Sequence, residues 1–421
     1  MVENIYRSYD IRRLPSPVAY TFLFLVYIST FRIFATLPLE DLHQVVSTCA
    51  IILLSVFYIL NLIINIGKSR ITRLDVLMWI FILVNFLAAY RGHIVFGQPY
   101  CYGIMAQRSV LLSLSGILLI TFLNRGLITI TQIEKSFLII SLSLLFLYYF
   151  FFLFVNPVHF TDDEFVAYSP IRGYRYRFQF ALVIMLLFYS LFKISHEKKS
   201  RFIIIVLLIL FYLVYYLQSR TTLVVLAFTL IIYFYRNFSL HEKVRKILIY
   251  GTLIFIGATV LVGLGYTALF DKYILLFHNV LDAFVKETPD EASSAMRFME
   301  FHTALDYIVK NPWLGNGFIS NQWNGGWQSI FGYFYPVDIG ILGNIFVYGL
   351  VGTILIYLPY YFSLNMSRKI HSKNVFYKTC EYMLFFFFLS MLISAGNIRD
   401  SSCIMLLVGL IYYFCCKIFK H

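Results

Sequence analysis

Long apolar runs recur along most of this chain and constrain its fold more than any other feature. There are twelve of them, near 18–36, 44–66, 74–90, 104–123, 136–155, 178–195, 202–217, 219–235, 246–266, 337–362, 376–396 and 402–416. A helix needs about 17–25 such residues to cross a bilayer. With 60% hydrophobic and 13% charged residues, the chain is too apolar for a soluble fold, in which about 25% of residues are charged. The sequence therefore predicts an all-α, polytopic membrane protein with about twelve transmembrane helices.

The charges between the runs divide the connecting segments into two kinds. One kind is basic and recurs on one side of the predicted membrane, at 68–73, 193–201, 236–246 and 368–378. The other kind is mixed or acidic, as at 37–43. Because Lys and Arg concentrate in cytoplasmic loops, the basic side and both termini are predicted to be cytoplasmic. The net charge of +13 is thus attributed to orientation in the membrane, and nucleic acid is not an expected partner.

Two of the predicted outer segments are much longer than the others. The first covers 156–177 and the second covers 267–336, some 70 residues. Connections in compact domains are usually about 4–6 residues long. In the second segment, apolar residues at helical spacing after Ser293 and the stop signal Pro312 predict a short helix over 293–310. The chain is therefore predicted to be a single membrane domain, 1–421, with its chemistry on two large extracytoplasmic loops.

The first outer loop ends in three closely spaced arginines, Arg172, Arg175 and Arg177. Guanidinium groups form bidentate hydrogen bonds with phosphate oxygens, for which Arg is better suited than Lys. Because the positive-inside rule disfavours three arginines on the outer side, anion binding is favoured over anchoring at lipid headgroups. Pairing with the acidic residues at 162–164, which would make the cluster structural, stays open.

The second outer loop adds further candidates for substrate binding. Arg297 lies in the first turn of the predicted helix, where the helix dipole disfavours a cation and so suggests an anionic partner, and His302 lies on the same helix. Gly315 and Gly317, within the sequence NPWLGNGF, permit either close approach of backbone to a ligand or a tight turn. The aromatic rings of Trp323 and Trp327 suit stacking on sugars and also the membrane interface.

Three more polar residues lie at the predicted outer ends of apolar runs. Asp338 opens the tenth run, where a carboxylate either caps the helix, forms an ion pair or acts as a general base. Arg220 and Arg399 occupy outer turns with few partners nearby in the sequence, so both could face the same outward cavity, and Arg91 is a weaker candidate. The six cysteines show no metal-ligand spacing, and there is no glycine-rich phosphate loop. No metal or cofactor is therefore expected.

Several of these motifs stand in an order that resembles the O-antigen polymerase and O-antigen ligase superfamily. They are SRT at 219–221, an Arg-Gly loop before the sixth run, Arg297 upstream of NPWLGNGF, and GLVG at 349–352. The resemblance covers roughly 170–352. It implies a GT-C-like, metal-independent glycosyltransferase of the bacterial inner membrane that uses a glycan on undecaprenyl diphosphate. By position, Arg172 and Arg297 would grip the diphosphate, with Arg175, Arg177 and Arg220 as neighbours.

One departure from this pattern favours the polymerase branch of the superfamily. Ligases carry a His eleven positions before the first Gly of the GLxG element, and here that position is Asp338. A polymerase would join lipid-linked repeat units into O-antigen or capsular polysaccharide, with Asp338 as the base of an inverting displacement. A ligase that transfers glycan to a lipid core or protein, a lipid-linked glycan flippase and a passive assembly partner are the alternatives. Whether a chain-length regulator protein binds is left open.

Overall fold

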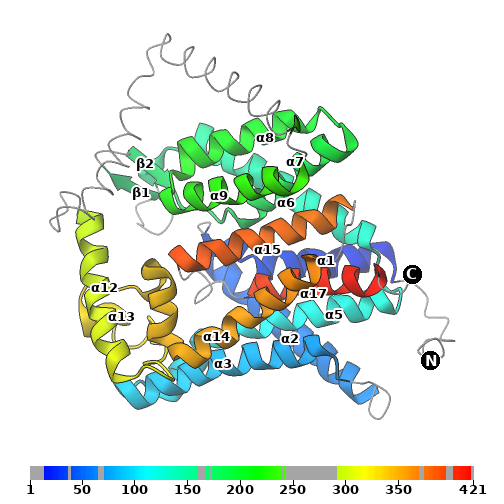
Figure 1. Ribbon diagram of the computed structural model, residues 1–421. Coiled ribbons are helices and arrows are strands. Elements are labelled where there is room, and N and C mark those ends of the chain that lie inside the picture. Colours follow the sequence, from blue (N-terminus) through cyan, green and yellow to red (C-terminus); the bar gives the residue numbers. More distant parts are fainter. Residues whose placement is uncertain are drawn as a thin grey trace, which may run out of the picture.

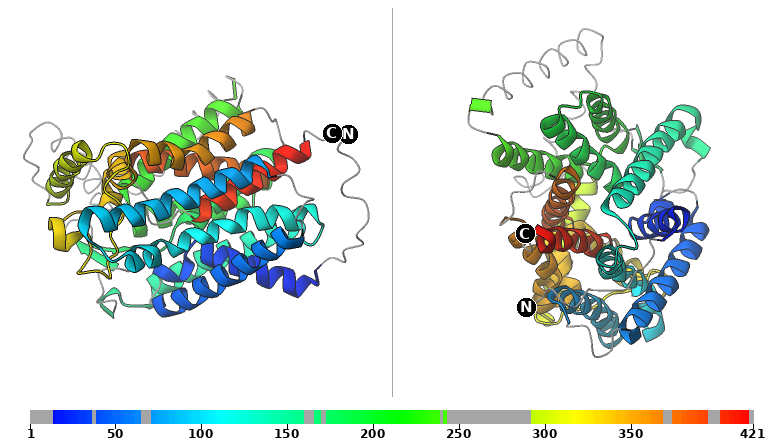
Figure 2. Two further views of the ribbon diagram at one scale, coloured as in Figure 1. Left: turned by 90° about the horizontal axis from the view of Figure 1, so that it is seen from below. Right: turned by 90° about the vertical axis from the view of Figure 1, so that its right-hand side faces the viewer.

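The computed structural model describes residues 14–36, 39–64, 71–159, 166–169, 173–238, 241–242, 292–368, 374–394 and 402–418. Over these ranges the protein is a bundle of helices that run side by side (Figures 1 and 2). The exception is one antiparallel hairpin, in which β1 (Val166–Ser169) pairs with β2 (Gly173–Tyr176). The prediction of an all-α, polytopic membrane protein is confirmed, with the hairpin as a small addition inside the first long loop.

The described helices form two groups only because residues 243–291, which separate them, lie outside the described residues. The first group comprises α1 (Ser16–Thr30), η1 (Ile33–Thr36), α2 (Glu40–Ile64), α3 (Arg73–Phe96), α4 (Tyr100–Gln107), η2 (Arg108–Ser113), α5 (Leu114–Asn124), α6 (Ile130–Phe154), η3 (Pro157–His159), α7 (Ala181–Glu197), α8 (Phe202–Phe211), the π-helical η4 (Tyr212–Leu217) and α9 (Arg220–Asn237). The second group comprises α12 (Ala292–Lys310), α13 (Trp327–Phe331), η5 (Pro336–Ile339), α14 (Gly340–Arg368), α15 (Val375–Ile393) and α17 (Ser402–Ile418).

Eleven of the twelve predicted apolar runs coincide with helices in the described ranges. The remaining run, 246–266, lies outside the described residues. Within the described residues, six helical segments are long and apolar enough to cross a membrane, and three shorter apolar helices accompany them. The protein is therefore a multi-pass membrane protein.

The helices differ in how much of their apolar surface the protein itself covers. Residues 181–190 of α7 and 402–411 of α17 are all buried. Both helices pack against α15. In addition, α7 contacts α6 and α8, and α17 contacts α5 and α14. By contrast, Ile52, Ile59 and Ile63 on α2 are 59%, 54% and 56% exposed. A helix that is apolar all round but only partly covered by protein is suited to face lipid, so α2 lies at the periphery and α7 and α17 form the core.

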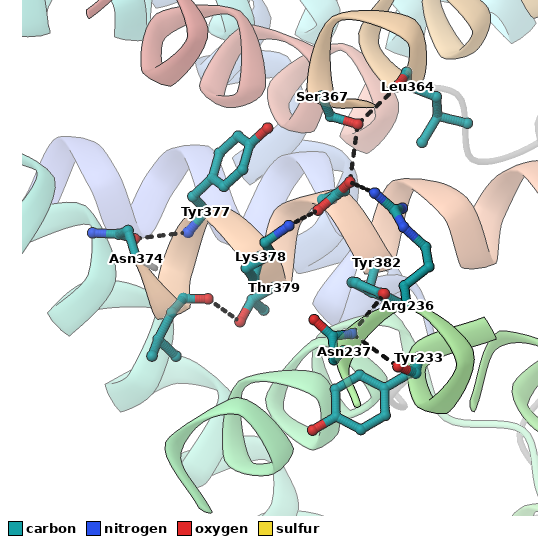
Figure 3. Close-up of polar contacts among 12 residues, drawn as sticks. Tyr233, Arg236, Asn237, Leu364, Ser367, Asn374, Tyr377, Lys378, Thr379 and Tyr382 are labelled. Carbon is teal, nitrogen blue, oxygen red and sulfur yellow. Dashed lines mark hydrogen bonds and ion pairs between the residues drawn. The ribbon is translucent and has the colours of Figure 1, made fainter. Parts of the chain in front are cut away.

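A buried carboxylate ties three helices together at the predicted cytoplasmic end of the bundle. Glu381, on α15, is 1% exposed and accepts hydrogen bonds from Arg236 of α9 at 3.0 Å, Lys378 at 2.9 Å and Ser367 of α14 at 3.0 Å. Figure 3 shows Arg236, Lys378 and Ser367 converging from their separate helices. Two cations and a hydroxyl thus compensate the cost of burying this charge.

Removing that carboxylate is expected to destabilise the bundle. Glu381→Ala would leave Arg236 and Lys378 facing each other without their shared anion, and loss of one partner of a buried pair costs about 3–5 kcal/mol. The matched control is Glu197→Ala, because Glu197 pairs with Lys193 and Lys199 but is 32% exposed, and such pairs contribute about 0–1 kcal/mol. Chemical unfolding in detergent micelles measures both. Equal losses of unfolding free energy in the two variants would contradict a structural role for Glu381.

Candidate functional site

The described parts of both long predicted outer loops lie at one end of the bundle. The hairpin β1–β2, α12 and α13 lie together there, at the left of Figure 1. The start of α1 and the end of α17 lie toward the opposite end (Figures 1 and 2). Most of the described residues that the sequence singled out for chemistry therefore lie on one side of the protein.

The segment NPWLGNGF is inserted into a break in α14. The helix is interrupted at Gly349, whose φ of 68° and ψ of −179° are not helical. The backbone N–H groups of Leu350 and Val351 donate to the carbonyls of Pro312 and Trp313, at 2.9 and 3.2 Å. In return, the N–H groups of 316 and 317 donate to carbonyls of α14 at 346 and 347, at 2.8 and 3.0 Å. Backbone groups freed by the break are thus satisfied by a second segment, as a broken membrane helix requires.

The glycines of this segment serve packing. Gly315 and Gly317 are buried and have φ of +67° and +92°. A Cβ atom at Gly315 would overlap the backbone of Gly349, and one at Gly317 would overlap the backbone of Gly92 on α3. The sequence left open whether these glycines, named as candidates for substrate binding, allow ligand approach or a tight turn, and protein backbone already occupies the space beside them. We therefore assign them to close packing between the loop, α3 and α14.

Arg91 fixes the same segment from α3. Its Nε and Nη2 atoms donate to the Gly315 carbonyl at 3.2 and 3.1 Å, and Nη2 also donates to Asn311 Oδ1 at 3.0 Å. Asn311 Nδ2 in turn donates to Asn316 Oδ1 at 2.9 Å. The guanidinium thus satisfies loop carbonyls, which explains an arginine on the outer side without an anionic ligand.

Substitution at Gly317 is expected to prevent correct folding. Gly317→Ala combines a positive φ with overlap against the backbone of α3, so the loop would have to leave its place in α14. Gly97→Ala is the control, because Gly97 also has a positive φ of 74° but nothing lies within 4 Å of its Cβ position. We expect Gly97→Ala to cost only about 1 kcal/mol, and Gly317→Ala to lose most monodisperse protein on size-exclusion chromatography. Comparable yields would show that the close contact is dispensable.

The two tryptophans proposed for sugar stacking differ in position. Trp327, on α13, is 4% exposed, and its ring lies 6.1 Å from Phe96, 6.1 Å from Phe331 and 5.6 Å from Phe346. It belongs to an interior aromatic cluster, a position that favours neither stacking on a sugar nor anchoring at the membrane interface. Trp323 is half-buried against the same core. The burial of Trp327 could not be predicted, because composition does not reveal which aromatic side chains are covered.

Asp338, Arg297 and Arg177 come together at the outer end. Asp338 lies in η5, which packs against α12. Partial burial disfavours its ionised form, and the positive charges of Arg297 and Arg177 both act against that effect. Arg297 is the sixth residue of α12, so it lies beyond the first turn, where the effect of the helix dipole fades. The neighbouring carboxylate therefore accounts for this cation better than the dipole argument does.

A second carboxyl group, Glu300, belongs to the same place and was not identified from the sequence. Glu300 is 1% exposed, and its Oε1 accepts a hydrogen bond from the Tyr335 N–H at 2.9 Å. Burial, and then the negative charge of Asp338, raise the pKa of Glu300 to about 7, against the lowering effects of the Tyr335 N–H bond and of Arg297. One signal was available: Glu300 lies three residues after Arg297 and four before buried Ala304, on the inward face of the helix.

Two tyrosines complete the group, which we call the outer cluster: Arg177, Arg297, Glu300, Tyr333, Tyr335 and Asp338. Tyr333 is 49% exposed. Burial and the negative charges of Asp338 and Glu300 raise the pKa of Tyr333, whereas Arg177 lowers it. The Tyr335 hydroxyl is a hydrogen-bond partner of Gln328 Nε2. The cluster therefore combines two guanidinium groups, two carboxyl groups and phenol hydroxyls, some of them open to solvent.

The remaining predicted site residues lie apart from this cluster or outside the description. Arg175 is in β2, which packs against η4, and Arg220 begins α9 just after η4. His302 is exposed on α12 beside the rings of Phe298 and Phe301, at 4.5 and 5.8 Å. Arg172 and Arg399 lie outside the described residues. Among the described residues, no group of three or more His, Cys, Asp or Glu side chains is placed to hold a metal ion.

Comparison with known protein families supports the resemblance seen in the sequence. The model of the O-antigen ligase family matches residues 204–357. The match spans Arg220, the outer-cluster residues of the second loop, NPWLGNGF and the broken part of α14. The predicted resemblance to the O-antigen polymerase and ligase superfamily is confirmed over this part of the chain. No curated protein matches the sequence.

Proposed function

We propose that this membrane protein is a polysaccharide polymerase that joins undecaprenyl-diphosphate-linked repeat units at the outer face of the bacterial inner membrane. The observation that carries the proposal is the outer cluster, in which the Asp338 carboxylate lies within the field of Arg297 and Arg177. A carboxylate beside two guanidinium groups suits a reaction that needs both a base and a diphosphate leaving group. The product would be O-antigen or a capsular polysaccharide.

The reaction is a displacement at the anomeric carbon of the donor sugar. A hydroxyl group of the acceptor repeat forms the new C–O bond, the bond from that carbon to the diphosphate breaks, and the lipid diphosphate leaves with the electron pair. Asp338 accepts the hydroxyl proton, which gives inversion in a single step. Arg297 and Arg177 stabilise the negative charge on the leaving group, with Arg172 as a further diphosphate ligand.

Other residues predicted from the sequence would extend the binding site. Arg175 and Arg220 lie on neighbouring elements, β2 and the start of α9, and would contact the diphosphate or the first sugars. Arg399 and His302 are assigned to the same substrate surface, as is Trp323. The partners of the protein are then the lipid-linked oligosaccharide, the surrounding lipid and, where one exists, a chain-length regulator protein. The cytoplasmic termini follow from the basic inner loops.

Ligation is the second candidate function, because the matched family is described as O-antigen ligase. A ligase would transfer finished glycan to a lipid core or protein. By the resemblance, ligases carry a His at the position that Asp338 occupies in this chain. This difference favours the polymerase.

A flippase would need charges along a path through the membrane. One basic residue, Arg32, lies within an apolar run, 18–36. The structure places Arg32 in a turn after the end of α1, with a φ of 50°. The arrangement around Arg32 therefore gives no support to a translocation path.

Cells that lack the protein test the function in its native setting. We expect single repeat units on the acceptor in place of a ladder of chain lengths, with the ladder restored by the wild-type gene. A ligase would give a different result, since polymer would still form and accumulate on undecaprenyl diphosphate without reaching its final acceptor. Unchanged surface glycan would argue for a passive partner.

A further inference from the structure

The second carboxyl oxygen of Glu300 is buried and has no hydrogen-bond partner among the described residues. Its other oxygen, Oε1, accepts from the Tyr335 N–H. Leaving a buried carboxylate oxygen unsatisfied costs free energy, more for a charged group than for a neutral one. A proton on this carboxyl group removes most of that cost, so the burial itself favours the neutral form.

Glu300 also holds the backbone turn that carries Asp338. The Tyr335 N–H donates to Glu300 Oε1 at 2.9 Å, and the Tyr335 carbonyl accepts from the Asp338 N–H at 3.0 Å. The peptide groups of Tyr335 are therefore fixed on both sides, by α12 and by η5. A change in the Glu300 side chain can therefore alter the position of Asp338 through one intervening residue, Tyr335.

The charges around Glu300 come from three places in the chain. Its own helix, α12, contributes Arg297, η5 contributes Asp338, and the segment after β2 contributes Arg177, which acts on Asp338 and Tyr333. The segment before η5 contributes Tyr333 and Tyr335. The fourth element, α14, packs on α12, but its only charged residue, Arg368, is at its far end. Two nearby carboxyl groups with partial burial resist ionising together.

We propose that Glu300 is a positioning residue that stays protonated while Asp338 is ionised, so that the outer cluster keeps a net positive charge for the lipid diphosphate. The inference rests on the proposed polymerase function. With Glu300 neutral, two arginines and one carboxylate leave one positive charge beside the leaving group. With Glu300 ionised that charge is cancelled, and the diphosphate is bound less tightly.

The direction of the pH effect follows from this charge balance. The pKa of Glu300 is about 7, so raising the pH through 7 adds a negative charge to the cluster. The KM for the lipid-linked donor is expected to rise about fivefold between pH 6 and pH 8, the effect of one charge at a moderate distance and intermediate dielectric constant. The donor is a diphosphate diester and has no proton to lose in this range.

The test compares wild-type protein with Glu300→Gln and with the control Glu197→Gln at the opposite end. Glu300→Gln keeps a carbonyl acceptor for the Tyr335 N–H but cannot ionise, so its KM should stay low and independent of pH. Glu197→Gln should show the wild-type rise. A Glu300→Gln protein whose KM rises as in the wild type would overturn the inference, because another group would then be titrating.

A measurement without substrate separates this inference from the proposed function. Infrared difference spectra between pH 6 and pH 8 should show a protonated carboxyl band that is lost at pH 8 in the wild type and is absent in Glu300→Gln. If the wild type makes no polymer but shows this band, the polymerase proposal fails and the protonation of Glu300 stands. The inference on Glu300 is wrong if polymer forms but the wild type lacks the band, or if the band persists in Glu300→Gln.

Discussion

Replacing Arg297 by alanine is expected to lower the rate of polymer formation about 10²–10³-fold, the usual loss when one charge-stabilising donor is removed from an active site. Arg297 is exposed on α12 and acts on both carboxyl groups of the outer cluster. Its removal takes away a cation that opposes the charge on the leaving diphosphate. Because the side chain is exposed, the protein should still fold, and chain-length ladders on gels should shrink to single repeats.

Two further variants make the Arg297 result specific. Arg297→Lys keeps the charge but loses the planar fork, so an intermediate rate is expected. Lys310→Ala removes a cation from the same helix, one that lies 4.6 Å from the centre of the Tyr307 ring, and should keep at least half of the wild-type rate. Arg297→Ala with a wild-type ladder would exclude this arginine from the reaction.

Asp338→Asn is expected to lower kcat about 10²–10⁴-fold, the contribution of a positioned general base, while the KM for the donor falls because the outer cluster loses one negative charge. Asparagine matches the size of aspartate but cannot accept the hydroxyl proton. Asp338→His should restore part of the rate, because imidazole is a base and the resemblance places His here in the ligases. Asp306→Asn, an exposed change on α12, is the control. An Asp338→Asn protein with an unchanged kcat would rule out the base role.

The sequence predicts the spans well because the thickness of the bilayer sets the length of each apolar run. It predicts the interior of the outer end less well, because that depends on contacts between distant segments. The run 337–362 reads as one continuous helix, yet α14 is broken at Gly349, where NPWLGNGF inserts. Glycines in such a motif are equally compatible with ligand approach and close packing until their neighbours are known.

The candidate site likewise contains residues that could be identified from the sequence and others that could not. Asp338 was identified because a charge at the start of an apolar run is conspicuous, and Arg297 because it lies in the predicted helix upstream of NPWLGNGF. Glu300 was not, because a single acid within a helix gives no sign that its carboxyl group is buried at 1% exposure. Among the loop arginines, the structure brings Arg177 to Asp338, and the spacing of three arginines alone could not select it.

The most direct measurement incubates the purified protein, in a lipid bilayer, with undecaprenyl-diphosphate-linked repeat units as the only substrate. The proposed function predicts a ladder of lipid-linked chains and release of undecaprenyl diphosphate, one molecule for each new linkage. No extension of the repeats, with transfer appearing only when a lipid core or protein acceptor is added, would contradict a polymerase and identify a ligase.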